Sequence, residues 1–251
     1  MNYITPMEHK YFNINYEFDR QKVHQRICEQ VNAGKPDYVC VADGVIMDVA
    51  NRNPEYLEVI NSGMFCICDS SFVPLYIRLI YGEKKEQYTG SEIFLDLVAS
   101  RRFRMAFMGT KQNVLDGLRQ ELSAHNPEVK NMLFYELPFR DVDDFDYPGI
   151  AAMLNADGAD IIWVALGAPK QELFMHHLKP YLEHGVMIAV GAAFKFYSGA
   201  SVNRAPEWMV RHHMEFIYRV YTEPSKQLKR CSSILRSLPR VLVAEWRRRN
   251  R

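Results

Sequence analysis

Short runs of apolar residues recur along the chain, and between them lie segments whose apolar positions follow a helical period. Several runs are apolar at successive positions, which is typical of strands covered on both faces. The runs predict strands at residues 11–18, 37–42, 64–69, 102–109, 131–137, 160–167 and 186–194. The intervening segments predict helices at residues 20–34, 53–62, 71–81, 91–100, 111–124, 148–157 and 169–184. Strand alternating with helix predicts a mainly parallel α/β sheet with helices on both faces.

This alternation stops toward the end of the chain, where the pattern becomes helical only. Residues 206–222 and 225–250 both have a helical period, and Pro239 interrupts the second segment. We therefore predict two parts, an α/β core over residues 1–200 and an amphipathic helical appendage over residues 201–251.

Charge is distributed unevenly between these two parts. The segment from Ser225 to Arg251 contains nine Lys or Arg and one acidic residue, Glu245, whereas the other 224 residues carry 22 basic and 29 acidic groups. An acidic body with a basic tail indicates an anionic partner, either a membrane or a nucleic acid. A basic helix that is simply solvated is the alternative.

The cysteines and the start of the chain both indicate a reducing compartment. The five cysteines are odd in number and lack metal-type spacing, and Cys66 and Cys68 share one face of a predicted strand. We expect them to be reduced core residues. The opening MNYITPMEHKYF lacks the charged-then-apolar pattern of a signal peptide. No window approaches the roughly 20 apolar residues of a membrane span, so a cytosolic protein is expected.

Polar and glycine residues follow several of the predicted strands. Asp43 and Asp69 come at the ends of two of them, and Gly167, Gly191 and Lys195 come at the ends of two others. Ligands of parallel α/β sheets collect beyond the carboxyl ends of the strands, so these residues predict a site at one rim. For each Asp the alternative is a helix N-cap, which is the commoner role of an Asp after a strand.

The segment WVALGAPKQELF (163–174) carries the clearest signal for an anionic ligand. Gly167 makes a turn and Pro169 suits the first position of a helix, whose amides could hold a phosphate beside Lys170. The alternative is an ordinary strand-to-helix turn with Lys170 and Glu172 solvated on the first helical turn.

Other ligand signatures are weaker or absent. The run DVDDFD (141–146) has the D-x-D spacing that holds a divalent metal, but it lies in a polar stretch, so an acidic surface loop is favoured and no metal is predicted. The G-x-G-x-x-G and G-x-x-x-x-G-K-[ST] patterns are missing, and no cofactor is predicted. A nucleotide-dependent enzyme without these patterns stays an alternative.

Five segments together resemble the WecG/TagA/CpsF family of bacterial glycosyltransferases. They are TGSEIF (89–94), VALGAPKQE (164–172), VGAAFKFYSG (190–199), RAPEWM (204–209) and EFIYRVYTEP (215–224). Their order and spacing match the family over roughly residues 10–225.

The resemblance implies an activity and a location. Such enzymes have a Rossmann-like core with a C-terminal helical appendage. They transfer a hexose-type sugar, N-acetylmannosamine, its uronic acid or a related sugar, from a UDP-sugar to a polyprenyl-diphosphate-linked sugar, with inversion and without a metal. The products are cell-surface polysaccharides or teichoic-acid-type polymers. The expected location is peripheral, at the inner face of the cytoplasmic membrane. The basic tail is then expected to contact the membrane rather than nucleic acid, and a homo-oligomer is compatible with the sequence.

The resemblance also assigns roles residue by residue. Asp69 matches the aspartate proposed as the family's catalytic base, and Gln171 matches the family's glutamine. Asp43 falls where the family commonly has an Asn, with Val41 in place of a preceding Thr. Asp43 or Gln171 is expected to orient one of the two sugars. The substrates would be bound by residues of the rim and the appendage, namely Thr89, Gly90, Gly109, Gly167, Lys170, Gly191, Phe194, Lys195, Arg204 and Arg219.

Three departures from the family pattern bear on these roles. Cys68 and Ser70 flank Asp69 where the family has Pro and Gly, Lys195 replaces an Asp, and Gln87 replaces an Arg. The retained Asp69 predicts that catalysis is kept, while the donor sugar stays open. A non-catalytic nucleotide- or lipid-binding protein on the same fold is the alternative.

Overall fold

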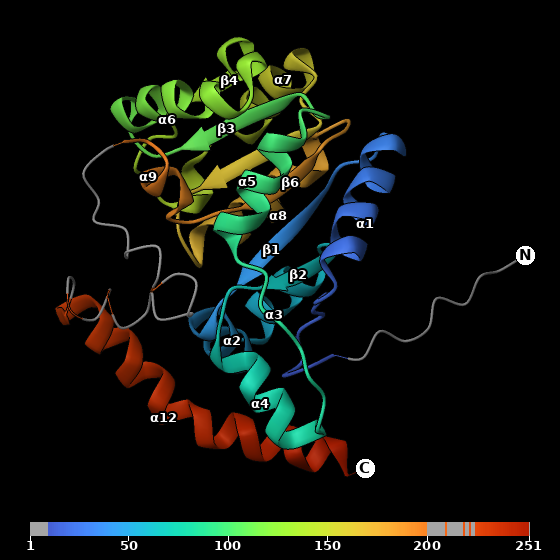
Figure 1. The fold of residues 1–251 in the computed structure, drawn as a ribbon, viewed down its shortest axis with the longest axis vertical. Helices are drawn as coiled ribbons and strands as arrows, with labels where there is room; N and C mark the ends of the chain where they lie inside the picture. Colours follow the sequence, from blue (N-terminus) through green and yellow to red (C-terminus); the bar gives the residue numbers. More distant parts are fainter. Residues whose placement is uncertain (1–9, 200–208, 210–217, 219–220, 222–223, 251) are drawn as a thin grey trace, which may run out of the picture.

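A computed structural model of the chain describes residues 10–199, 209, 218, 221 and 224–250, with side chains from residue 237 onward in the last range. The described part is built on one six-stranded sheet in the order β2-β1-β6-β5-β3-β4, with every pairing parallel (Figure 1). The strands are β1 (Asp37–Ala42), β2 (Phe65–Cys68), β3 (Met105–Gly109), β4 (Leu133–Tyr135), β5 (Ile161–Ala165) and β6 (Val186–Ala189). The predicted parallel α/β sheet is confirmed.

Alternate residues of each strand enter two different cores. Tyr38, Cys40 and Ala42 of β1 pack on one face of the sheet, and Val39 and Val41 pack on the other. Because both faces are covered, the strands are apolar at successive positions.

Helices cover both faces of the sheet. The first face carries α2 (Gly44–Arg52), α3 (Pro54–Asn61), α4 (Phe72–Tyr81), α7 (Tyr147–Asp157), α8 (Lys170–Leu178) and part of α12 (Pro224–Arg249). The second face carries α1 (Arg20–Asn32), α5 (Gly90–Ser100), α6 (Gln112–His125) and α9 (Ala193–Phe196). Short 3₁₀ helices at Pro127–Asn131, Val142–Asp144 and Lys179–Tyr181 lie in the connections.

Two predictions about the elements are wrong, and one helix was not predicted. Residues 11–18 form isolated bridges, Tyr11 with Ile14 and Tyr16 with Cys66, instead of a strand. The chain turns back there because Phe12 and the residue after it have positive φ. The helix α2 is absent from the predicted set, and α12 continues through Pro239 without a break.

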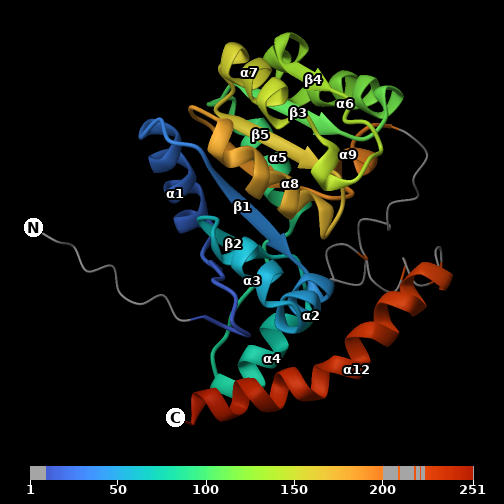
Figure 2. The ribbon, with the colours of Figure 1, turned by 180° about the vertical axis from the view of Figure 1, so that it is seen from behind.

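The helix α12 lies against α2 and α4, along the lower edge of the molecule in Figure 1 and again beneath them in the reverse view of Figure 2. Val241 and Glu245 are buried in this contact. The Glu245 carboxylate accepts hydrogen bonds from the Phe12 amide at 2.8 Å and from the Tyr81 hydroxyl at 2.7 Å. Ser237 also donates to Asp48 of α2. These bonds attach α12 to the segment before α1, to α4 and to α2. A domain boundary at residue 200 stays a prediction.

Two further expectations concern residue chemistry and membrane spans. The cysteines described, Cys28, Cys40, Cys66 and Cys68, are thiols outside any disulfide, and the last three are buried. Reduced core cysteines at 66 and 68 are therefore confirmed. Among the helices within the described ranges, none has the length and apolarity that crossing a bilayer requires. The helix predicted at residues 206–222 lies outside the described residues.

Replacing Glu245 with alanine is expected to loosen α12 from the core. The Glu245→Ala variant removes the acceptor of the buried Phe12 amide and of the half-buried Tyr81 hydroxyl, which costs about 2–3 kcal/mol in the free energy of unfolding. Urea denaturation measures this loss. The matched control is Glu86→Ala, which removes a carboxylate from an exposed ion pair with Lys84 and is expected to cost under about 1 kcal/mol. Equal losses in the two variants would show that the hydrogen bonds of Glu245 add no stability.

Candidate active site

The carboxyl ends of the strands bring the predicted residues to one rim of the sheet. Asp43 follows β1, Asp69 follows β2, Gly109 ends β3, and Gly167 and Gly191 each lie two residues beyond β5 and β6. Because all six strands run in the same direction, all five positions share one edge. This is the edge at which open parallel sheets bind their ligands.

Asp43 and Asp69 are neighbours on this rim. The register pairs Ala42 of β1 with Cys68 of β2, so the two aspartates come directly after paired residues. The Asp69 amide donates to the Ala42 carbonyl at 3.1 Å, which continues the ladder by one step. Adjacent strands are spaced about 4.8 Å apart, so the rim carries two carboxylates side by side.

Asp43 serves as a helix cap. Its Oδ1 accepts hydrogen bonds from the amides of Val45 and Ile46, both at 2.9 Å, and thereby begins α2. The capping role that local sequence favoured is therefore present at this position. A contact between Asp43 and a sugar stays a prediction.

At the neighbouring strand end the cap comes from Ser70. Its hydroxyl accepts from the amides of Phe72 and Val73 at 3.2 and 3.4 Å, at the start of α4. The departures from the family pattern are thus accommodated: Cys68 is a buried strand residue, and Ser70 supplies the cap. Asp69 stands exposed at the rim. Its Oδ1 accepts from the Gly90 amide at 3.3 Å.

The segment TGSEIF brings a second helix start to Asp69. The Tyr88 amide donates to the Cys68 carbonyl at 3.0 Å, so this segment runs beside the end of β2. Thr89 caps α5 in a reciprocal pair with Glu92, and its hydroxyl is engaged in that cap. Gly90 is buried, and a side chain there would lie 3.1 Å from the Val41 side chain. The first turn of α5 therefore packs over β1 and faces Asp69.

Gln171 joins the two glycine turns of the rim. Its side-chain carbonyl Oε1 accepts from the Gly167 amide at 3.1 Å and from the Gly191 amide at 3.2 Å. The side chain is buried, so it lies beneath the rim surface. Its contact with a substrate stays a prediction, and so does a phosphate held by the amides at the start of α8.

The structure places Glu172 beneath the rim, which sequence reasoning missed, because a charge on the first helical turn was expected to be solvated. The side chain is fully buried. Its Oε1 accepts from Gln171 Nε2 at 2.8 Å and its Oε2 accepts from the Tyr56 hydroxyl at 3.2 Å. Burial raises the pKa of Glu172 to about 7, and the nearby Asp43 adds to the rise. The helical spacing from Glu172 to the buried Met175 was the available signal.

Gln171 and Glu172 together position the two glycine turns of the rim. Glu172 accepts a hydrogen bond from the amide nitrogen of Gln171, and this contact orients the amide group. With the nitrogen turned toward Glu172, the oxygen of Gln171 faces the Gly167 and Gly191 amides. This one oxygen links the turns that follow β5 and β6.

Other predicted binding residues have structural roles. The Lys170 ammonium donates to the Arg140 carbonyl and lies 5.1 and 5.3 Å from the rings of Phe139 and Phe145. It thus holds the loop between β4 and α7. Gly109 has φ +113, and a side chain there would lie 2.6 Å from the Ala165 carbonyl oxygen. Only glycine allows β3 and β5 to end this close together.

Phe194 lies in the core. The ring is fully buried among Phe94, Phe107 and other core residues, with centroids 5.7 and 6.1 Å away. A contact between Phe194 and a substrate stays a prediction. Lys195, the next residue on α9, is exposed. Arg204 and Arg219 lie outside the described residues.

The acidic run at residues 141–146 forms the exposed loop that the sequence favoured. Asp146 caps α7 through the Gly149 amide at 3.0 Å, and Asp143 lies 3.9 Å from His177. Across the described part of the chain, no three His, Cys, Asp or Glu side chains gather where they could hold a metal ion.

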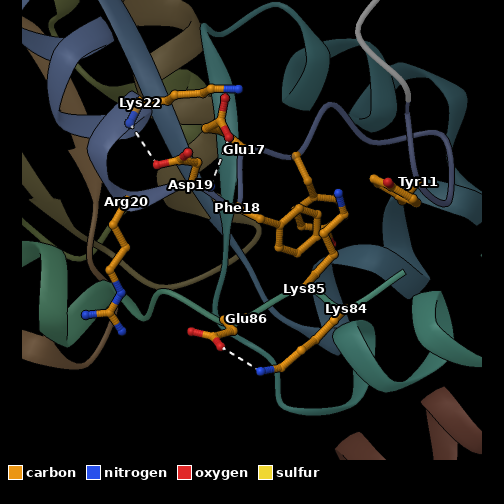
Figure 3. A pocket seen from close by; sticks show the side chains of 10 residues that line it. Tyr11, Glu17, Phe18, Asp19, Arg20, Lys22, Lys84, Lys85 and Glu86 are labelled. Atoms are coloured by element: carbon orange, nitrogen blue, oxygen red, sulfur yellow. Dashed lines mark hydrogen bonds and ion pairs between the residues drawn. The ribbon is translucent and has the colours of Figure 1, made fainter. Parts of the chain in front are cut away.

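A hollow of about 610 Å³ lies at the outer edge of the sheet, between the segment before α1 and the loop after α4 (Figure 3). Lys85 reaches into it beside Phe18. Its cations are largely neutralised, because Lys85 pairs with Glu83 at 2.9 Å and Lys84 with Glu86 at 3.4 Å. The strand-end rim, with its exposed Asp69, is the stronger candidate.

Comparison of the sequence with known proteins shows to which family the chain belongs. The sequence profile described as the glycosyl transferase WecG/TagA/CpsF family matches residues 4–251. The chain belongs to the WecG/TagA/CpsF family. The resemblance seen in the sequence is thereby confirmed, and this WecG/TagA/CpsF chain is a glycosyltransferase.

Two curated relatives carry the same printed name, N-acetylglucosaminyldiphosphoundecaprenol N-acetyl-beta-D-mannosaminyltransferase. The protein of Bacillus subtilis is 30% identical over 199 residues, which cover 78% of this chain and 75% of the relative. The protein of Bacillus spizizenii is 27% identical over 218 residues, which cover 86% of this chain and 82% of the relative.

The buried Glu172 is expected to make stability depend on pH. Because its pKa is raised from 4.5 to about 7, the folded protein keeps a proton that the unfolded chain releases. This stabilisation is complete below pH 4.5 and is lost as the pH rises to about 7, by roughly 3 kcal/mol. Glu172→Gln removes it, so the variant gains on the wild type over that range in urea denaturation.

The control for this prediction is Glu183→Gln, which changes an exposed carboxylate near the end of the same connection. Its stability curve against pH is expected to run parallel to that of the wild type. A parallel curve for Glu172→Gln as well would mean that Glu172 ionises normally in the folded protein.

Proposed function

We propose that this chain transfers a hexose-type sugar from a UDP-sugar to a polyprenyl-diphosphate-linked sugar, with inversion at the anomeric carbon and without a metal. The observation that carries the proposal is the exposed carboxylate of Asp69 at the rim of the parallel sheet, in a member of this family. The acceptor class is taken from the two Bacillus relatives, whose names contain a sugar diphosphoundecaprenol.

Asp69 is the proposed general base. It removes the proton from the acceptor hydroxyl while the oxygen attacks the anomeric carbon from the face opposite to the UDP group. Proton transfer by a positioned side chain contributes about 10²–10⁴-fold to such a rate. Asp43, adjacent in the register, is proposed to orient one of the two sugars.

The donor is proposed to lie along the rim above β6, β5 and β3. The negative charge that develops on UDP needs donors or cations already in place. Lys195 on α9 is exposed beside the Gly191 turn, and Arg204 and Arg219 are proposed to add charge from the appendage. Gln171 supports this surface indirectly by holding the Gly167 and Gly191 turns together.

The place of action is proposed to be the inner face of the cytoplasmic membrane, where a polyprenyl-linked acceptor is held. The basic residues of the tail are proposed to contact anionic lipid, since each Lys or Arg near such a surface adds about 1 kcal/mol of attraction. The donor sugar is proposed to be N-acetylmannosamine, its uronic acid or a related hexose.

Asp69→Asn is expected to lower turnover by about 10²–10⁴-fold while UDP binding is kept. The assay measures transfer from a panel of UDP-sugars to a short-chain polyprenyl-diphosphate sugar, with and without chelator, and calorimetry measures UDP binding. Asp43→Asn is the matched control, because Asn caps a helix as well as Asp does. It is expected to fold normally and to lose less activity.

Three results would contradict the proposal. Near-normal transfer by Asp69→Asn would remove Asp69 from the role of base. Loss of transfer with chelator would show that a metal takes part. Tight UDP binding by the wild type, without transfer from any donor, would favour the non-catalytic binding protein.

A further inference from the structure

The first turn of α5 lies against the candidate base. Gly90 is the first residue of this helix, and its amide donates to Asp69 Oδ1 at 3.3 Å. The first amides of a helix have no partner inside it, and they carry the positive end of the helix dipole. A carboxylate that accepts from such an amide is held in place, and its charged form is favoured. The start of α5 therefore acts on both the orientation and the ionisation of Asp69.

This helix start is fixed by close packing on the sheet and by a link to α1. Gly90 is buried over β1, where an added side chain would lie 3.1 Å from the Val41 side chain. Thr89 caps the helix in its reciprocal pair with Glu92. Glu92 in turn accepts from the Arg20 guanidinium of α1 at 2.5 Å. The first turn of α5 is thus packed on β1 and joined to α1.

Tyr88 anchors the segment that leads into α5. Residues 82–89 connect α4 to α5 and contain neither helix nor strand (Figure 1). The Tyr88 ring is fully buried in the core on the second face of the sheet. Its amide donates to the Cys68 carbonyl at 3.0 Å. Cys68 directly precedes Asp69, so Tyr88 is bonded to the strand that carries the candidate base.

The Tyr88 hydroxyl joins the same segment to two helices. It donates its hydrogen to Asp96 Oδ2 of α5 at 2.7 Å. Because that hydrogen is used, the hydroxyl oxygen accepts from His24 Nε2 of α1, also at 2.7 Å. Burial and the hydrogen bond to Asp96 raise the pKa of Tyr88, so the hydroxyl keeps its hydrogen at neutral pH. Tyr88 is therefore held at its amide, its ring and its hydroxyl.

We propose that Tyr88 and Gly90 are positioning residues for Asp69. Gly90 presents the amide that orients the carboxylate and keeps it ionised, and Tyr88 fixes the place of that amide relative to β2. In this role both residues act through Asp69 and not on the substrate. The catalytic part of this inference rests on the proposed function, in which Asp69 is the base, whereas the contact between α5 and Asp69 does not.

Other groups at this strand end make such an amide necessary. Among the described residues, Asp43 follows the neighbouring strand and Glu92 lies in the first turn of α5. Both are acids, and like charges oppose the ionisation of Asp69. Burial raises the pKa of the Cys68 thiol and keeps it neutral. The Gly90 amide offsets the two neighbouring carboxylates, so that Asp69 stays able to accept a proton.

Gly90→Pro removes the amide hydrogen that Asp69 accepts. Proline suits the first position of a helix, where its fixed φ fits and no intrahelical bond is lost. Thr89 has a ψ of 156°, in the range that a residue before proline adopts. The matched control is Gly90→Ala, which brings a Cβ to the same place beside Val41 but keeps the amide. The comparison of the two variants therefore tests the hydrogen bond itself.

The readout is the titration of the Asp69 carboxyl, followed by NMR with isotope-labelled aspartate and assigned by its absence in Asp69→Asn. The midpoint in Gly90→Pro is expected to lie about 0.5 pH unit above that in Gly90→Ala, because the carboxylate has lost its contact with the helix start. In the transfer assay kcat is expected to be about tenfold lower than in Gly90→Ala, with the donor KM within about twofold, since a misplaced base slows the reacting step.

Tyr88→Phe tests the anchor separately. It keeps the ring and the amide of Tyr88 but breaks both bonds of the hydroxyl, so a smaller upward shift of the Asp69 midpoint is expected. The control is Tyr147→Phe, which removes a hydroxyl that donates to the Val142 carbonyl at 2.6 Å on the other face of the sheet. This control is expected to lose similar stability in urea denaturation without moving the Asp69 midpoint.

An Asp69 midpoint that is the same in Gly90→Pro and Gly90→Ala overturns the proposal. If Gly90→Pro does not fold, Tyr88→Phe decides, and a midpoint equal to that in Tyr147→Phe overturns the proposal in the same way. Full transfer by Asp69→Asn, together with a shifted midpoint in Gly90→Pro, defeats the proposed base and leaves the contact between α5 and Asp69 standing.

Discussion

Parallel strand direction is the constraint on which the rest of this structure depends. Because the strands are parallel, the carboxyl ends of all of them lie at the same rim of the sheet. The connection from each strand to the next therefore crosses one face of the sheet and covers it. The strands are therefore buried on both faces and apolar throughout. The predicted site residues Asp43, Asp69, Gly167 and Gly191 therefore lie in the turns along this rim.

Some polar groups at this rim form hydrogen bonds that position its helices and turns, whereas others are exposed to solvent. Asp43 starts α2, Ser70 starts α4, and Gln171 ties the turns after β5 and β6. Glu172 lies a layer deeper and sets the orientation of Gln171. Asp69, by contrast, is exposed where two helix starts converge. Rigid support below an exposed carboxylate is the arrangement that a positioned general base requires.

Most of the sheet and the identity of the rim could be predicted from the sequence, because apolar runs and strand-end residues are local signals. Residues 11–18 have the composition of a strand, but their backbone is not extended throughout, since Phe12 has positive φ. Phe194 sits in a family segment yet belongs to an aromatic cluster with Phe94 and Phe107, which only tertiary packing reveals. Glu172 was missed for the same reason, since its burial depends on Tyr56 of a distant helix.

The bond between Glu245 and the Phe12 amide joins positions 233 residues apart. Contacts of such sequence separation form late, because the intervening chain must first be ordered. During synthesis the parallel sheet can assemble from the segments already made, because α12 follows all six strands in the sequence. The residues of the rim therefore precede in the sequence the helix that packs against α2 and α4, and the bond between Glu245 and Phe12 can form only after the segments of the sheet have been made.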